Sequence, residues 1–151
     1  MENYWNDDSL ISAKLKEKRK LLQYEIRMFR ETCARFINFK SLSQFEKNLL
    51  VESLASHTRI LRDFFYDKKV KHINDLFAQD FLSENVDWKK VGPPETEIIN
   101  TAKKKADKQL AHLSTWRIKL ERDGKKGWDF YETLQDDMEK VIKKFNEVSI
   151  K

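Results

Sequence analysis

Apolar residues recur at steps of three, four or seven along four stretches of this chain, which is the spacing of one buried helix face. Charged and polar residues take the positions between them, where a helix would face solvent. The pattern therefore predicts an all-α fold with four long helices. Their expected bounds are 9–37, 43–66, 95–122 and 129–148.

The expected helix ends rest on capping patterns and on residues that interrupt helices. Ser43 with Glu46 has the spacing of a capping box, in which a side chain and the backbone satisfy each other in the first turn. Asp129 with Glu132 has the same spacing at the start of the fourth helix. A Gly-Pro-Pro run at 92–94 precedes the third helix, because proline is tolerated at a helix start but not inside one. Four helices joined in this order favour an up-and-down bundle.

The stretch 67–94 breaks this periodicity and predicts a short irregular insertion between the second and third long helices. Its fragments 73–77 and 80–82 carry enough apolar residues to form a brief helix. Trp88 and Val91 are expected to hold the insertion against the bundle. Because no repeat, low-complexity tract or linker interrupts the chain, we expect all 151 residues to form one domain.

Composition agrees with a charged helical domain. Charged residues make up 36% of the chain, with only three glycines and two prolines, a balance that favours long amphipathic helices. The net charge of +5 is too small by itself to indicate nucleic-acid binding. The single Cys33 excludes an internal disulfide, and its place on the apolar stripe of the first helix predicts a buried core thiol.

The sequence has neither the features of a membrane span nor those of a signal peptide. The first eight residues are acidic and lack a basic start followed by an apolar run. No stretch approaches the roughly 20 apolar residues that cross a bilayer. We therefore expect a cytoplasmic protein without a membrane partner.

Most familiar catalytic and cofactor-binding motifs are absent from the sequence. The three histidines are scattered, and neither an HExxH pattern nor paired cysteines occur. There is also no glycine-rich phosphate loop and no GxSxG nucleophile turn. The sequence thus predicts neither a metal nor a cofactor.

One candidate for chemistry is a polar cluster at the border of the third helix's apolar stripe. Lys105, Lys108 and His112 are separated by three and four residues and so share one helix face. A histidine beside ammonium groups resists protonation and would serve as a proton acceptor. The simpler interpretation is a border histidine that hydrogen-bonds to a neighbouring helix.

A second polar cluster lies in the second helix. His57 takes a position in the apolar stripe, where a histidine is more often a satisfied core residue than a ligand. Arg59 and Asp63 are one turn apart and are expected to form an ion pair. If that pair faces inward, antiparallel packing of the second and third helices brings it close to His112.

The segment Asp107-Lys-Gln-Leu-Ala-His112-Leu-Ser-Thr-Trp-Arg117 resembles the Asn-Lys-x-x-Ala-His-Leu-Thr-x-x-Arg segment of bacterial helical proteins that are similar to the HEPN superfamily. The segment from Glu52 to Phe64 resembles the other recurrent segment of these proteins. The resemblance spans roughly 45–145. It implies an all-helical bundle that is commonly paired as a dimer.

Active HEPN ribonucleases cleave RNA without a metal by a motif of arginine, four to six residues, and then histidine. This chain has the histidine of the motif, His112, but it has no arginine at any of the three positions that the motif spacing allows before that histidine. These positions are Lys105, Ala106 and Asp107. Lysine lacks the planar, two-pronged guanidinium with which arginine grips a phosphate. From the resemblance, the candidate catalytic residues are His112, Asp107, Arg59 and Asp63. The candidates for binding RNA or phosphate are Lys105, Lys108 and Arg117.

The missing arginine favours a HEPN-like helical module without catalysis, which would bind a partner protein, a second copy of itself or a nucleotide. Such a module fits a toxin–antitoxin or defence context. The alternative is a metal-independent ribonuclease in which His112 acts as general base on the ribose 2′-hydroxyl. A weaker alternative is a nucleic-acid-binding protein, since 101–126 carries nine basic residues against three acidic ones.

Overall fold

The computed structural model describes residues 8–67, 74–110 and 127–150, and within these ranges the fold is all-α without a strand. The long helices are α1 (Asp8–Arg35), α2 (Gln44–Tyr66), α4 (Glu97–Leu110) and α6 (Tyr131–Val148). The short ones are the 3-10 helices η1 (Phe36–Ser41) and η2 (Ala78–Phe81) and the one-turn α3 (Trp88–Val91). The predicted all-α class with four long helices is confirmed.

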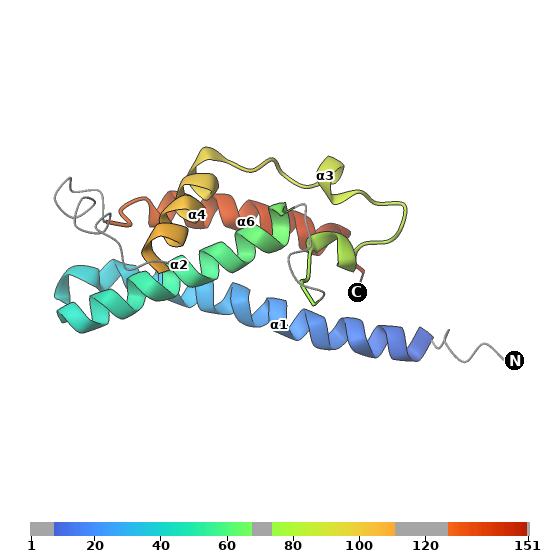
Figure 1. The fold of residues 1–151 in the computed structure, drawn as a ribbon, viewed down its shortest axis with the longest axis horizontal. Coiled ribbons are helices and arrows are strands. Elements are labelled where there is room, and N and C mark those ends of the chain that lie inside the picture. The colour runs from blue at the N-terminus through green and yellow to red at the C-terminus, as the bar shows by residue number, and fades with distance from the viewer. Residues whose placement is uncertain (1–7, 68–73, 111–126, 151) are drawn as a thin grey trace, which may run out of the picture.

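Each long helix packs against two others, so that α1, α2, α4 and α6 close a ring around one core. Figure 1 shows α1 and α2 side by side along the length of the molecule, joined at one end by η1. Arg30 of α1 pairs with Glu139 of α6, whereas Arg19 of α1 donates to Ser149, the residue that follows α6. Because the numbers rise on one helix as they fall on the other, α1 and α6 are antiparallel. The structure is an up-and-down bundle, as the periodicity predicts.

The two predicted capping boxes have different outcomes. At the start of α2, the Ser43 backbone N–H donates to Glu46 Oε2 at 2.8 Å, and the Glu46 N–H donates to Ser43 Oγ at 3.3 Å. The box predicted for Asp129 and Glu132 is wrong, because α6 begins two residues later and its N-cap residue makes no side-chain cap. The Tyr131 N–H instead donates to the Trp128 carbonyl at 3.0 Å, so a turn precedes the helix.

The other predicted helix ends are close to those observed. The first helix, expected to reach residue 37, ends its α-helical part at Arg35 and continues as η1. The third, expected from residue 95, begins at Glu97, where the Thr96 hydroxyl accepts the Ile99 N–H at 3.3 Å. The predicted end of that helix, at residue 122, lies outside the described residues.

The insertion between α2 and α4 is held by Trp88, as expected from the sequence. The indole is buried, and its Nε1 donates to the Phe65 carbonyl at 2.8 Å. The ring lies so close over Gly92 that a Cβ there would be 2.7 Å from it. Val91 was expected to share this task, but it is 36% exposed, because the single turn of α3 meets the bundle through Trp88. The predicted brief helix is η2, whereas residues 74–77 are not helical.

The core is centred on Phe145 of α6, which is fully buried. Four aromatic rings surround it at centroid distances of 5.5 to 5.9 Å and steep angles, the arrangement that aromatic quadrupoles favour. These rings belong to Phe64, Phe65, Phe81 and Trp88. Cys33 is also buried, as predicted, and burial raises the pKa of its thiol to about 12. Among the described helices, none has both the length and the apolar character that a bilayer crossing requires.

Candidate functional site

The interface between α2 and α4 joins two of the predicted site residues. Arg59 Nε lies 3.1 Å from Asp107 Oδ1, in an ion pair without an aligned hydrogen bond. The other carboxylate oxygen, Oδ2, accepts from the ammonium of Lys103, one turn earlier on α4. Asp107 is therefore held between one cation of its own helix and one from α2.

The expected ion pair between Arg59 and Asp63 is replaced by this contact across the two helices. Asp63 instead pairs with the neighbouring Arg62, whose Nη1 lies 3.4 Å from Asp63 Oδ1. The physical reason is that packing of α4 on α2 supplies a carboxylate, Asp107, that the spacing along one helix does not reveal. Arg59 and Asp63 both lie on α2, but each pairs with another residue, so the predicted ion pair between them does not form.

Arg62 is the centre of a cluster that the sequence analysis missed. Its Nε and Nη2 donate to the two oxygens of Glu95 at 2.7 and 3.0 Å, and its Nη1 donates to Asp67 at 2.6 Å. The hydrogen bond to Glu95 contributes most to raising the pKa of the guanidinium further above its ordinary range. The cluster joins the end of α2 to the segment that leads into α4, which is a structural role.

His57 faces α1 rather than α4. Its Nδ1 lies 2.6 Å from Glu25 Oε2, and its ring meets Tyr24 edge-on at a centroid distance of 6.1 Å. Residues two positions apart on a helix point to nearly opposite sides, so His57 is turned away from Arg59. The interpretation of His57 as a histidine satisfied by its neighbours is confirmed.

The remaining predicted site residues are not gathered in one place within the described chain. Lys108 is exposed on α4, while Lys105 is half-buried on the side of α4 away from Asp107. His112 and Arg117 lie outside the described residues, so the expected approach of His112 to Arg59 stays a prediction.

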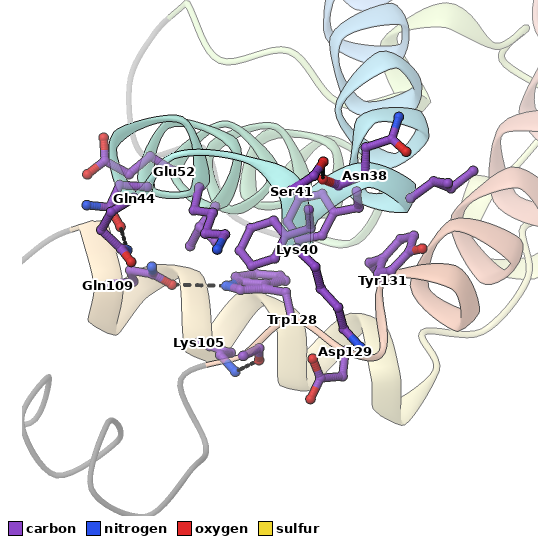
Figure 2. A pocket seen from close by; sticks show the side chains of 17 residues that line it. Asn38, Lys40, Ser41, Gln44, Glu52, Lys105, Gln109, Trp128, Asp129 and Tyr131 are labelled. Carbon is purple, nitrogen blue, oxygen red and sulfur yellow. Dashed lines mark hydrogen bonds between the residues drawn. The ribbon is translucent and has the colours of Figure 1, made fainter.

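Lys105 lines a pocket of about 870 Å³ at the end of the bundle where α1 turns into α2 (Figure 2). The wall is formed by η1, the first turns of α2, the last turns of α4 and the segment 127–131. Figure 2 shows Trp128 in the middle of this wall, with Gln109 at its edge and Lys105 beneath. The pocket thus combines segments that are far apart in the sequence.

Two contacts fix the Trp128 side of the pocket. Trp128 Nε1 donates to Gln109 Oε1 at 3.1 Å, and the Lys105 ammonium donates to the Gly127 carbonyl. The same ammonium lies 5.6 Å from the Trp128 ring centroid and 5.4 Å from that of Phe130. Burial lowers the pKa of Lys105, and the charge of Asp129 opposes this effect, so a second anionic group near Lys105 would further favour its charged form.

Metal ligands do not cluster in the part of the chain that the structure describes. No group of three histidine, cysteine, aspartate or glutamate side chains is placed there to hold an ion. The candidate sites contain ion pairs, aromatic rings and a half-buried lysine. Searches for similar proteins gave no match to this chain, neither among protein-family models nor among curated proteins nor among solved structures.

Proposed function

We propose that this chain is a helical binding module of the HEPN-like kind that its segments resemble, and that it pairs with a second copy of itself. The pairing surface is the outer face of the hairpin formed by α1 and α2. One observation carries the proposal: four large apolar side chains on this face stand about half exposed. They are Leu21 at 63%, Tyr24 at 47%, Leu49 at 50% and Ile60 at 45%.

The α1 part of this outer face follows from helical spacing. Leu21, Tyr24 and Met28 succeed one another at steps of four and three residues, so they share one face of α1. Glu25, beside Tyr24, bonds to His57 of α2. The apolar row on α1 therefore runs along the edge that adjoins α2.

The α2 part continues the same surface. Leu49, Ser53 and Ile60 succeed one another at steps of four and seven residues, so they share one face of α2, on which Leu49 and Ile60 are exposed. The Ser53 hydroxyl hydrogen-bonds to that of Thr32 on α1 at 2.8 Å, which brings the two helices together beneath the row. The exposed apolar side chains thus form one strip across the hairpin.

Apolar surface on such a strip is stabilised by burial, at about 25 cal/mol for each Å² removed from water. Large exposed apolar patches on a soluble protein mark interaction surfaces for this reason. A two-fold axis lays the same strip upon itself, so each copy covers the apolar groups of the other. The resemblance to proteins that commonly pair as dimers favours a second copy over an unrelated partner.

The test is to place charge on the strip and measure the molecular mass in solution by light scattering. The wild-type chain is expected as a dimer, and the double variant Leu49→Lys with Ile60→Lys as a monomer of unchanged helical content. Val91→Lys is the matched control, because Val91 is an exposed apolar residue on α3, away from the hairpin face. A wild-type monomer, or a control that dissociates equally, contradicts the proposal.

A second candidate function is metal-independent RNA cleavage, and the contact between Arg59 and Asp107 favours it. Asp107 lies five residues before His112, at a position where the ribonuclease motif of HEPN proteins carries its arginine. Arg59 of α2 brings a guanidinium against that position from another helix, at 3.1 Å. In this hypothesis His112 takes the proton of the ribose 2′-hydroxyl and Arg59 steadies the phosphate.

RNA cleavage with EDTA present decides between the two candidates. The ribonuclease hypothesis expects a 2′,3′-cyclic phosphate product and a loss of about 100-fold or more in His112→Ala, the usual scale for a general base. Arg59→Ala should also reduce cleavage, and His72→Ala serves as the control histidine. An absence of cleavage leaves the binding module as the function.

A further inference from the structure

The pocket at the α1–α2 corner takes no part in the pairing face or in the contact between Arg59 and Asp107. Its volume of about 870 Å³ lies in the range of pockets that hold small-molecule ligands. Lys105 lies in its wall, half-buried in the second half of α4. We propose that this pocket binds a small aldehyde that carries an anionic group, and that the amine of Lys105 forms an imine with it.

The amine of Lys105 is held in a fixed place beside two aromatic rings. Its Nζ lies 5.6 Å from the ring centroid of Trp128 and 5.4 Å from that of Phe130. These two rings are themselves stacked at a centroid distance of 5.4 Å. The ammonium also donates to the Gly127 carbonyl, which orients it. The nitrogen is therefore positioned by its neighbours and is partly shielded from water.

This position makes Lys105 a better nucleophile than an exposed lysine. A lysine must lose a proton before its nitrogen can attack a carbonyl carbon. Burial lowers the pKa of Lys105, and the charge of Asp129 opposes this effect only in part. Lys104, the preceding residue of α4, is exposed. We therefore expect Lys105 to react with an aldehyde faster than Lys104 does at neutral pH.

Imine formation at Lys105 needs no oxidant, reductant or further reactant. The nitrogen releases a proton to water, and its lone pair then adds to the aldehyde carbon. The former carbonyl oxygen leaves as water once it has gained two hydrogens, so that a C=N bond replaces the C=O bond. An ammonium ion and an aldehyde thus give a protonated imine and one water. The imine N–H can donate to the Gly127 carbonyl as the ammonium does.

Two further lysines in the wall suit an aldehyde that carries a phosphate or a carboxylate. Lys40 belongs to η1 and Lys47 to α2, and the acids among the described lining residues are Glu52 and Asp129. Figure 2 shows Lys40 extending from η1 toward Asp129, so we expect Lys47 to hold the anion. Because Lys47 would neutralise the charge of the ligand, the anion would not oppose the loss of a proton from Lys105.

The test uses pyridoxal 5′-phosphate, an aldehyde with a phosphate group, as the probe on the full chain. Borohydride reduction fixes the imine, and tandem mass spectrometry of the digested protein assigns the label to individual lysines. Lys105 should carry about 10-fold more label than Lys104, because only Lys105 lies in the pocket that holds the phosphate. Pyridoxal, which lacks the phosphate, should label Lys105 about 10-fold less, the scale of one charged hydrogen bond.

Two variants test where the phosphate binds. Lys47→Gln should lower the labelling of Lys105 by pyridoxal 5′-phosphate about 10-fold and leave its labelling by pyridoxal unchanged. Lys104→Gln is the matched control and should leave both unchanged, because Lys104 is exposed on α4 and does not line the pocket. The label is assigned on the wild-type chain, so the test remains decisive if a variant unfolds.

Three results would each overturn the pocket proposal. They are label spread over the lysines in proportion to their exposure, equal labelling of Lys105 by the two aldehydes, and full labelling in a folded Lys47→Gln variant. The proposal is independent of pairing, because none of the four apolar side chains of the pairing face lines the pocket. A monomeric chain that is labelled at Lys105 contradicts the pairing proposal alone.

Discussion

Arg62 and Glu95 are joined by two parallel hydrogen bonds, from Nε at 2.7 Å and from Nη2 at 3.0 Å. Such a two-pronged ion pair fixes direction as well as distance. It connects the end of α2 to the segment just before α4, so it helps to set the register of these two helices. The contact between Arg59 and Asp107 depends on that register.

Removing Arg62 should therefore destabilise the fold. In Arg62→Met the carboxylates of Glu95 and Asp67 lose their contacts with the guanidinium while they remain largely shielded, and we expect a loss of about 2–3 kcal/mol in the free energy of unfolding. Urea denaturation followed by circular dichroism measures it. Lys140→Met, which breaks the pair between the exposed Lys140 and Asp137, is the control and should cost less than about 1 kcal/mol. Equal losses in the two variants would show that the Arg62 cluster stabilises the fold no more than the pair between Lys140 and Asp137 does.

Phe145 should be one of the most costly residues to truncate. Its ring is fully buried among four other aromatic rings, so Phe145→Ala leaves a cavity and removes edge-to-face contacts. The expected loss is about 3–5 kcal/mol in the free energy of unfolding. Ile37→Ala, at a side chain that is 75% exposed, is the comparison and should have little effect. A loss below about 1 kcal/mol for Phe145→Ala would be incompatible with this core.

Cys33 should be unreactive in the folded protein. Burial raises the pKa of its thiol to about 12, and at pH 8 only about one molecule in ten thousand would carry the reactive thiolate. Labelling with a disulfide reagent should be slow in buffer and fast in concentrated urea. Complete labelling within seconds under native conditions would mean that α1 does not bury this side chain as described.

Asp137 should contribute to the pH dependence of stability. Hydrogen bonds from Lys140 and then Thr96 hold the pKa of this carboxyl below its ordinary value of 3.8. A depressed carboxyl pKa stabilises the fold above the ordinary value, and the contribution is lost as the pH falls through the folded-state pKa. Unfolding measured between pH 5 and pH 2 should therefore be less pH-dependent in Asp137→Asn than in the wild type. If stability depends on pH equally in the two proteins, Asp137 does not contribute to the loss of stability in acid.

The bundle could be predicted because its helices are specified by patterns within short stretches of the sequence. The apolar stripes that contain Phe29 and Leu61 are visible as spacing, and the cap formed by Ser43 is visible as a four-residue pattern. The cap predicted at Asp129 failed because a turn closed by Trp128 displaces the helix start, and no spacing rule reports such a turn.

The site was less predictable because its geometry is not local. The partner of Arg59 is Asp107, 48 residues later by their numbers, and only the packing of α4 on α2 brings them together. The pocket was missed for the same reason, since Phe39, Lys47 and Trp128 belong to separate segments without a shared motif. Lys105 is a candidate phosphate-binding residue in the sequence because it shares a helix face with His112, whereas the structure places it in the wall of the pocket.

Sedimentation equilibrium of the wild-type chain is the direct test of pairing through the α1–α2 face. The run covers roughly a hundredfold range of concentration around micromolar, where weak and moderate dimers both become visible. We expect twice the monomer mass at the upper concentrations, and dissociation into monomers in the double variant Leu49→Lys, Ile60→Lys. A single species of monomer mass at every concentration would contradict it.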